Sequence, residues 1–161
     1  MHSWTGGSTP KRSRFSDNVY LFANRAYAKK TGVSRTSRCE ERMSHIWRID
    51  ADASGAWCSV ATPTPGCSVY KSGFTAIEDI AFSKTGELYV LELASDGVFA
   101  FEAGLDTGQF PPAVLLDVKG KHTTELAAGQ LSQPGGVAVS RDNKVYVTDG
   151  VFTDGRLLRV S

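Results

Sequence analysis

The acidic residues best suited to chemistry stand at the ends of apolar strand-like segments. Glu78 and Asp79 precede the apolar residue Ile80, whereas Glu92 and Asp149 lie near or at the ends of two later segments, "ELYVLEL" and "KVYVTD". Carboxylate oxygens are hard ligands for divalent cations, and a bound cation can polarise a carbonyl group or activate water. The same acids also suit a structural role, in which they cap strand ends and face solvent. We expect the structural role.

A second oxygen-rich stretch, "DADASG" at residues 50–55, resembles the start of a calcium loop. Oxygen-bearing side chains occupy its first, third and fifth positions, and glycine follows at the sixth. An EF-hand loop also needs a bidentate glutamate at the twelfth position, where this chain has Ala61. Aspartate and glycine suit a hairpin turn equally well, so we expect a turn.

Other residue types with catalytic potential lack the necessary spacing. The histidines His2, His45 and His122 form no metal-ligand or catalytic pattern. Ser83 and Ser140 lie outside any G-x-S-x-G motif, so no serine nucleophile is indicated. The sequence therefore predicts no catalytic residue and no cofactor-binding residue.

The chain has three cysteines, Cys39, Cys58 and Cys67. The last two flank a proline-rich turn, "CSVATPTPGC", and a hairpin disulfide can span that separation. An odd number of cysteines without a secretory signal favours free thiols instead, and free thiols are our expectation. No second Cys/His pair has zinc-ligand spacing.

Charge is unevenly distributed along the 161 residues, although the net charge is only +1. The first 45 residues hold nine Lys/Arg and three Asp/Glu, and the other 116 hold nine and fourteen. We expect a basic segment of low periodicity or disorder over residues 1–44, and one mildly acidic domain over residues 45–161. The small net charge and the lack of an RNA-binding motif predict no nucleic-acid partner. The lack of a long apolar run predicts no membrane span.

The composition of the first residues also bears on location. No apolar h-region follows residue 1, so no secretory signal peptide is recognised. The first 38 residues are rich in Ser, Thr, Arg and Lys, which is typical of organelle transit peptides as well as of disordered tails. Within them, "NVYLFANRAYA" suits either a short strand or a short helix.

Two phrases repeat with an offset of 57 residues: "FTAIEDIAFSKTGELYVLEL" at residues 74–93 and "LSQPGGVAVSRDNKVYVTDG" at residues 131–150. Each indicates a strand, a tight turn and a second strand, with apolar residues dense enough for packing on two faces. The repeat predicts two equivalent structural units. The matched pairs are Ile80 and Val137, Ala81 and Ala138, Phe82 and Val139, Ser83 and Ser140, Gly86 and Asn143, Tyr89 and Tyr146, and Val90 and Val147.

Further strands complete each unit. The segments "HIWRIDADASGAWCSVA", "AVLLDVKGKHTTELAAG" and "GRLLRVS" each begin with a hydrophobic strand, and an insertion at residues 94–112 lengthens one unit. Helical periodicity is not apparent. Four short antiparallel strands per repeat predict an all-β fold, a partial β-propeller of about two and a half four-stranded blades, preceded by an irregular N-terminal segment.

These phrases resemble the NHL-like β-propeller family of the D and E proteins of the cyanobacterial scytonemin cluster. Its phrases "TDIAFGPDGxLYVLE" and "RV(D)PDGTRTTLASGLxxPxGVAV" are similar to "TAIEDIAFSKTGELYVLE" and "DVKGKHTTELAAGQLSQPGGVAV" here. The match covers residues 45–161, departs at Thr85 and Asn143, and fails over residues 1–44. The resemblance implies a roughly six-bladed, secreted or periplasmic propeller with no established catalytic residues.

Too few blades are expected to close a ring. We therefore expect either a fragment of a longer six-bladed protein or self-association through open blade edges. The expected function is a non-catalytic binding or structural module that uses the loops at the channel mouth, with a protein as partner. The alternative is a fragment of a metal-dependent hydrolase or lactonase of the gluconolactonase type, with Glu78, Asp79 and Asp149 as its candidate ligands.

Overall fold

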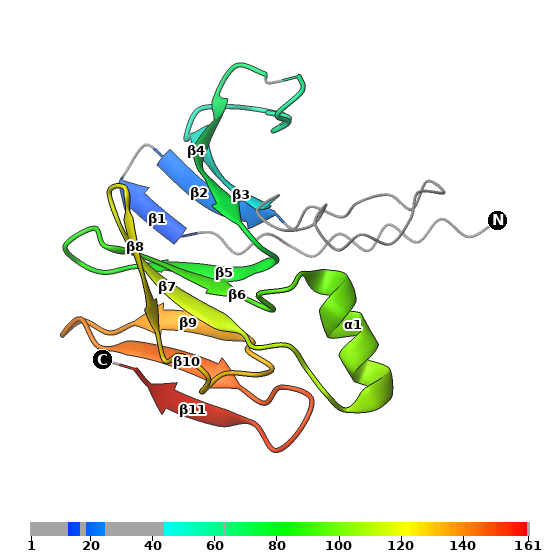
Figure 1. Cartoon of the computed structure of the whole chain (residues 1–161). Helices are drawn as coiled ribbons and strands as arrows, with labels where there is room; N and C mark the ends of the chain where they lie inside the picture. The colour runs from blue at the N-terminus through cyan, green and yellow to red at the C-terminus, as the bar shows by residue number, and fades with distance from the viewer. Residues whose placement is uncertain (1–12, 17–18, 25–43, 63, 161) are drawn as a thin grey trace, which may run out of the picture.

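The computed structural model describes residues 13–16, 19–24, 44–62 and 64–160. These residues form three antiparallel sheets that follow one another along the chain, and the strands of each sheet pair in chain order (Figure 1). The predicted β class is therefore confirmed. The first sheet comprises β1 (Ser13–Ser16), β2 (Val19–Asn24), β3 (Ser44–Asp50) and β4 (Cys67–Phe74). The second comprises β5 (Ile77–Phe82), β6 (Leu88–Glu92), β7 (Val114–Lys119) and β8 (His122–Leu126), and the third β9 (Gly136–Val139), β10 (Val145–Asp149) and β11 (Arg156–Arg159).

Among the described residues, one helix interrupts the β structure, and the expectation of strands alone was wrong there. α1 (Val98–Thr107) lies in the insertion between β6 and β7. It ends at Gly108, whose φ of 71° is left-handed and whose N–H donates to a carbonyl of the last turn. Within the described part of the chain, no helix is both long and apolar enough to cross a membrane. The buried cluster beneath α1 comprises Ala76, Leu93, Ala94, Val98 and Phe101, with Phe110 packed against it.

Two strands lie ahead of residue 45, where the sequence predicted low periodicity. β2 pairs with β3 in an antiparallel register that runs from Val19 opposite Asp50 to Asn24 opposite His45, and β1 pairs with β2. Of the two interpretations of "NVYLFANRAYA", the structure has the strand at Val19–Asn24. The segment "HIWRIDADASGAWCSVA" supplies one strand of the first sheet, β3, because residues 56–61 form no strand and β4 begins at Cys67. The rest of the basic segment, including Cys39, lies outside the described residues.

The two hairpins predicted by the 57-residue offset have the same turn. The Ser83 N–H donates to the Glu87 carbonyl at 2.9 Å, and the Glu87 N–H donates to Ser83 Oγ at 3.0 Å. Ser140 and Lys144 repeat both bonds at 2.9 and 3.0 Å. The third residue after each serine has a positive φ, 88° at the glycine and 59° at the asparagine. The same hydrogen bonds therefore close both hairpins.

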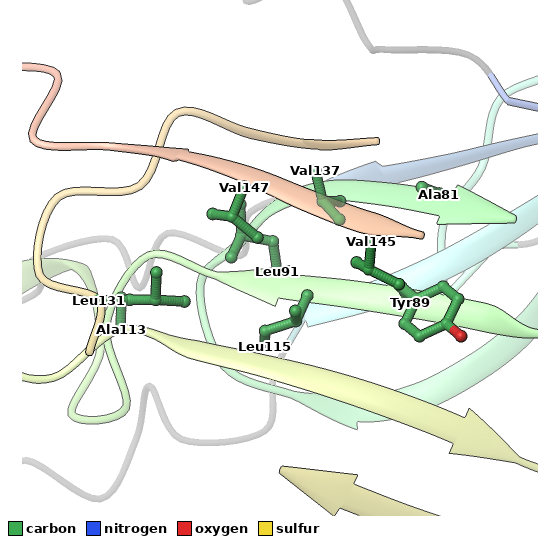
Figure 2. Packing of buried hydrophobic residues seen from close by; sticks show 9 residues of the cluster. All are labelled: Ala81, Tyr89, Leu91, Ala113, Leu115, Leu131, Val137, Val145 and Val147. Atoms are coloured by element: carbon green, nitrogen blue, oxygen red, sulfur yellow. The ribbon is translucent and has the colours of Figure 1, made fainter. Parts of the chain in front are cut away.

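The second sheet lies between the other two, so β5 and β6 are covered on both faces, whereas β8 at its edge is mostly exposed. In β6, Leu88 and Val90 pack with Ile46 of the first sheet. Tyr89 and Leu91 point the opposite way and pack against the third sheet (Figure 2). Contacts also join β5 to β9 and to β1 and β2, so the first strands of successive sheets lie near one another. The cluster between the second and third sheets comprises Ala81, Tyr89, Leu91, Ala113, Leu115, Leu131, Val137, Val145 and Val147.

Candidate functional site

The candidate acids gather near the end of the sheets that carries α1. Glu92 and Asp149 are the last residues of β6 and β10, and Glu78 and Asp79 lie near the start of β5. The exposed fractions of Asp79, Glu92 and Asp149 are 8%, 7% and 1%. Our expectation that these acids face solvent is therefore wrong for these three, whereas Glu78 is half-buried.

Two of the acids make the same kind of contact at equivalent positions. Glu92 Oε1 accepts the Thr75 N–H at 2.7 Å. Asp149 Oδ1 accepts the N–H groups of Ser132 and Gln133 at 3.0 and 2.9 Å. Thr75 and Ser132 are themselves 57 residues apart in the sequence. Each carboxylate thus ties the end of the second strand of its sheet to the loop that enters the first strand, which confirms the expected capping role.

Asp79 makes a different contact, because it joins two sheets. Its Oδ2 atom accepts the N–H of Val137 on β9 at 3.0 Å. Val137 also belongs to the apolar cluster between the second and third sheets. The bond therefore fixes β5 against β9 beside the packed interior.

Arg156 completes the surroundings of Asp149, and sequence reasoning missed it. Its Nε and Nη2 atoms lie 3.2 and 2.8 Å from Asp149 Oδ2, and Nη2 also donates to the Gln130 carbonyl. Burial by itself would raise the pKa of Asp149, but Arg156 and the two backbone donors outweigh burial and hold this pKa below its ordinary value. Arg156 is the cross-strand partner of Asp149. Pairing the last two strands in the sequence as a short hairpin would therefore have placed these two side chains side by side.

The predicted metal candidates are not brought together as a ligand set. Among the residues that the structure describes, no three or more His, Cys, Asp or Glu side chains are placed to hold a metal ion. A cation at Asp79 or Asp149 would compete with backbone N–H donors, and at Asp149 also with Arg156. The stretch at residues 50–55 begins with a turn, in which the Ala53 N–H donates to the Asp50 carbonyl at 3.0 Å.

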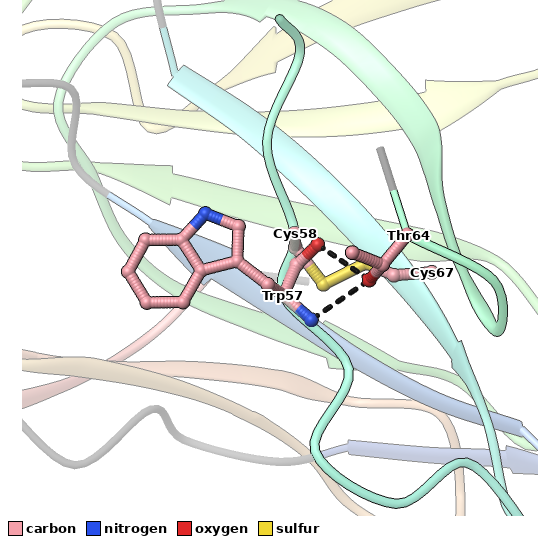
Figure 3. The surroundings of a disulfide bond; sticks show 4 residues. All are labelled: Trp57, Cys58, Thr64 and Cys67. Atoms are coloured by element: carbon pink, nitrogen blue, oxygen red, sulfur yellow. Dashed lines mark hydrogen bonds between the residues drawn. A yellow bond between two sulfur atoms is a disulfide. The ribbon is translucent and has the colours of Figure 1, made fainter. Parts of the chain in front are cut away.

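Cys58 and Cys67 form a disulfide, so the expectation of free thiols is wrong for this pair. Their Cα atoms are 5.6 Å apart, within the usual range. Thr64 Oγ1 accepts the Trp57 N–H at 2.9 Å and donates to the Trp57 carbonyl at 2.8 Å, so the loop is fastened beside the disulfide (Figure 3). The indole of Trp57 points away from these bonds, and the residue is 71% exposed.

A hollow of about 350 Å³ lies between β4 and the hairpin turns of the second sheet, at the end opposite α1. Lys71 Nζ donates to the Gly120 carbonyl at 2.6 Å. Lys119 Nζ lies 3.0 Å from Asp117 Oδ2 and 3.2 Å from Glu87 Oε1. The bonds to Asp117 and Glu87 raise the pKa of Lys119. Lys119 beside this hollow is thus paired with two carboxylates, and Lys71 is bound to a backbone carbonyl.

Exposed apolar residues accompany the buried acids at the α1 end. Phe99 lies on α1, and Val151 and Phe152 lie on the loop between β10 and β11 (Figure 1). Their exposed fractions are 40%, 48% and 63%. The ring centroids of Phe101 and Phe152 are 6.0 Å apart, so the loop contacts the helix. Phe99 precedes Phe101 by two residues and therefore lies on another side of α1, so the three exposed residues share one end of the molecule and not one continuous patch. We call Phe99, Val151 and Phe152 together the α1-end surface.

No protein-family model matches the chain, and no curated protein has a significantly similar sequence. The resemblance to the scytonemin-cluster D/E family therefore stays a prediction, as does the secreted or periplasmic location that it implies. The contacts of the strand-end carboxylates and the α1-end surface are the observations that bear on function.

Replacing Arg156 should change how stability depends on pH. The pKa of Asp149 in the folded chain lies below the value of about 3.9 expected when unfolded, so the unfolded state binds more protons on acidification. The stabilisation that ionised Asp149 gives the folded chain is present above about pH 4, and it is lost as the pH falls through the pKa of Asp149 in the folded state. Arg156→Gln should lower the free energy of unfolding at pH 7 by about 1 to 3 kcal/mol, and this difference should shrink towards pH 2.

Urea unfolding at a series of pH values measures this effect. Arg141→Gln, which replaces an exposed arginine in the β9–β10 turn, is the matched control and should reproduce the wild-type curve. If the free energies of unfolding of Arg156→Gln and the wild type differ by the same amount from pH 7 to pH 2, the ion pair does not cause the loss of stability at acidic pH.

The disulfide should be detectable in a single tryptic peptide, because cleavage after Arg48 and Lys71 leaves both Cys58 and Cys67 in residues 49–71. Denatured, unreduced protein treated with iodoacetamide should yield this peptide unlabelled and two hydrogen masses below its dithiol form. Reduction before labelling should add two alkyl groups. Labelling of both cysteines without reduction would disprove the bridge in the native protein.

Proposed function

We propose that the three sheets are consecutive blades of an NHL-like β-propeller, and that the protein serves as a non-catalytic binding or structural module. Three features support the propeller arrangement. Each sheet is a meander, adjacent sheets pack face to face, and the first strands of successive sheets contact one another. These features are those of blades arranged around an axis. Because propellers typically have four to eight blades, three sheets amount to part of a ring, as in a fragment of a longer six-bladed protein.

The observation that carries the non-catalytic role is the hydrogen bonding of the buried acids. Asp79, Glu92 and Asp149 each direct an oxygen at one or two backbone N–H groups at 2.7 to 3.0 Å. A buried carboxylate in such contacts satisfies donors that would otherwise lose their hydrogen bonds to water. The oxygens of these acids are therefore used as hydrogen-bond acceptors for the backbone, which supports a structural role for them and not a catalytic one.

The α1-end surface is where we place the binding role. Phe99 and Phe152 are aromatic, and aromatic residues are enriched where proteins bind one another. They lie on a helix and a loop held by packed strands, and loops on a rigid scaffold commonly carry binding residues. The proposed partner is therefore a protein with an apolar patch of its own.

The alternative function, a metal-dependent enzyme, would require the same acids to bind a metal ion. As a fragment of a metal-dependent hydrolase or lactonase, the chain would use Glu78, Asp79 and Asp149 as ligands. Asp79 and Asp149 would then have to exchange backbone N–H donors for an ion.

Divalent cations provide the test between these roles. Addition of Ca²⁺, Mg²⁺, Mn²⁺ or Zn²⁺ should leave the thermal unfolding midpoint unchanged. Without added metal, Asp79→Ala should lower the free energy of unfolding by about 1 to 3 kcal/mol, because the buried Val137 N–H loses its acceptor. A cation-dependent rise of the midpoint that Asp79→Ala abolishes would instead support the enzymatic alternative.

The binding role predicts a loss of partners when the α1-end surface is made polar. Immobilised wild-type protein should retain proteins from an extract of the source cells that the double variant Phe99→Ser/Phe152→Ser does not retain. Lys121→Ser, an exposed change at the opposite end of the sheets, is the control and should retain the wild-type set. Equal retention by the wild type and the double variant, with unchanged thermal unfolding, would refute this binding surface.

A further inference from the structure

The connection between β3 and β4 extends away from the three sheets (Figure 1). We call residues 51–66 the β3–β4 loop. Its described residues, 51–62 and 64–66, belong to no strand or helix, and none of them is buried. Burial of apolar surface, which holds the strands together, therefore contributes little to the conformation of this loop.

Hydrogen bonds fasten parts of the β3–β4 loop. Thr64 Oγ1 is bonded to both the N–H and the carbonyl of Trp57, in contacts exposed to water. At the base of the loop, the Asp50 N–H donates to the Gly66 carbonyl at 2.9 Å. Water competes for exposed donors and acceptors, so the net contribution of such bonds to stability is small. These bonds alone restrain the loop weakly.

The Cys58–Cys67 disulfide adds a covalent restraint (Figure 3). It ties the middle of the β3–β4 loop to the first residue of β4, and that residue is the cross-strand partner of Ile49 on β3. The loop is thus joined covalently to the first sheet. Cys58 is half-buried, whereas Cys67 is only 8% exposed. A reductant therefore reaches the bridge from the Cys58 side.

We propose that this disulfide is a redox switch that fixes or releases the β3–β4 loop while the sheets stay folded. The reductant is a small dithiol, which supplies two electrons. Its thiolate attacks Cys58 Sγ, the S–S bond breaks, and Cys67 leaves as a thiolate. The second thiol of the reductant then displaces Cys58. The reductant departs as a disulfide, and its two protons end on the two cysteines.

The packed core of the first sheet does not depend on the bridge. Ile46 and Phe74 are 0% and 5% exposed and belong to the cluster shared with the second sheet. Cys58 and Cys67 lie outside the apolar clusters formed by the described residues. Reduction therefore removes a restraint from the loop and leaves the packed strands in place.

The switch controls how exposed apolar side chains are displayed. Trp57 and Val60 are 71% and 64% exposed, and Trp57 directly precedes Cys58. In the disulfide form, the fastened backbone keeps the indole of Trp57 in one place (Figure 3). In the dithiol form, local opening of the loop lets this side chain occupy many positions. This inference does not rest on the propeller arrangement proposed above.

Limited digestion with chymotrypsin, which cleaves after tryptophan, tests the switch at Trp57. Both bridged cysteines follow that peptide bond, so residues 1–57 and 58–161 are separated by the cut in either redox state. Native protein reduced with dithiothreitol and blocked with iodoacetamide should be cut there about ten times faster or more than the disulfide form, because cleavage requires local opening. Cys58→Ser/Cys67→Ser should be cut equally fast without reductant. Cys39→Ser keeps the bridge and should respond to reduction as the wild type does.

The remaining outcomes would overturn the proposal. Equal rates of cleavage after Trp57 in the two redox forms would show that the β3–β4 loop is held without the disulfide. Reduction that also abolishes the β signal in circular dichroism and allows rapid cleavage after Tyr89 of β6 would show that the bridge supports the whole domain. A Cys39→Ser variant that no longer responds to reduction would trace the effect to Cys39.

Discussion

A sheet with apolar residues on both faces is stable only when another layer covers each face, and the rest of this structure depends on that constraint. β6 (Leu88–Glu92) shows it most clearly, because all five of its residues are buried. Full burial of a leucine or valine side chain contributes about 1.5 to 3 kcal/mol, so the covered strand is a large source of stability. The stacking of the first and third sheets on the second follows directly.

Because the sheets stack, backbone N–H groups near the α1 end need hydrogen-bond acceptors within the protein. Chain segments that enter β5 and β9 run close to packed strands, where their backbone N–H groups are shielded from water and need acceptors. Asp79, Glu92 and Asp149 supply these acceptors, and Arg156 balances the charge of Asp149. Residues that look like metal ligands in the sequence therefore supply hydrogen-bond acceptors that the folded chain itself requires.

Features set by local chemistry were predictable from the sequence, and features set by distant contacts were not. The hairpin turns follow from a serine and a left-handed glycine or asparagine within a few residues. α1 escaped prediction because it is short and depends on packing against Phe110 and the strand ends. The Cys58–Cys67 pairing was recognised as possible, but the odd number of cysteines favoured free thiols, because that number does not determine which cysteines meet in the fold. The burial of the acids depends on how the sheets stack, which no local pattern encodes.

Hydrogen–deuterium exchange followed by mass spectrometry tests the central claim most directly, because it compares strands of one sheet that differ in coverage. β6 is covered on both faces, whereas β8 (His122–Leu126) is mostly exposed at the edge. Amides of β6 should exchange only when the whole domain unfolds, and amides of β8 should exchange much faster through local opening. Exchange of β6 as fast as that of β8 would contradict the stacking of the second sheet between the other two.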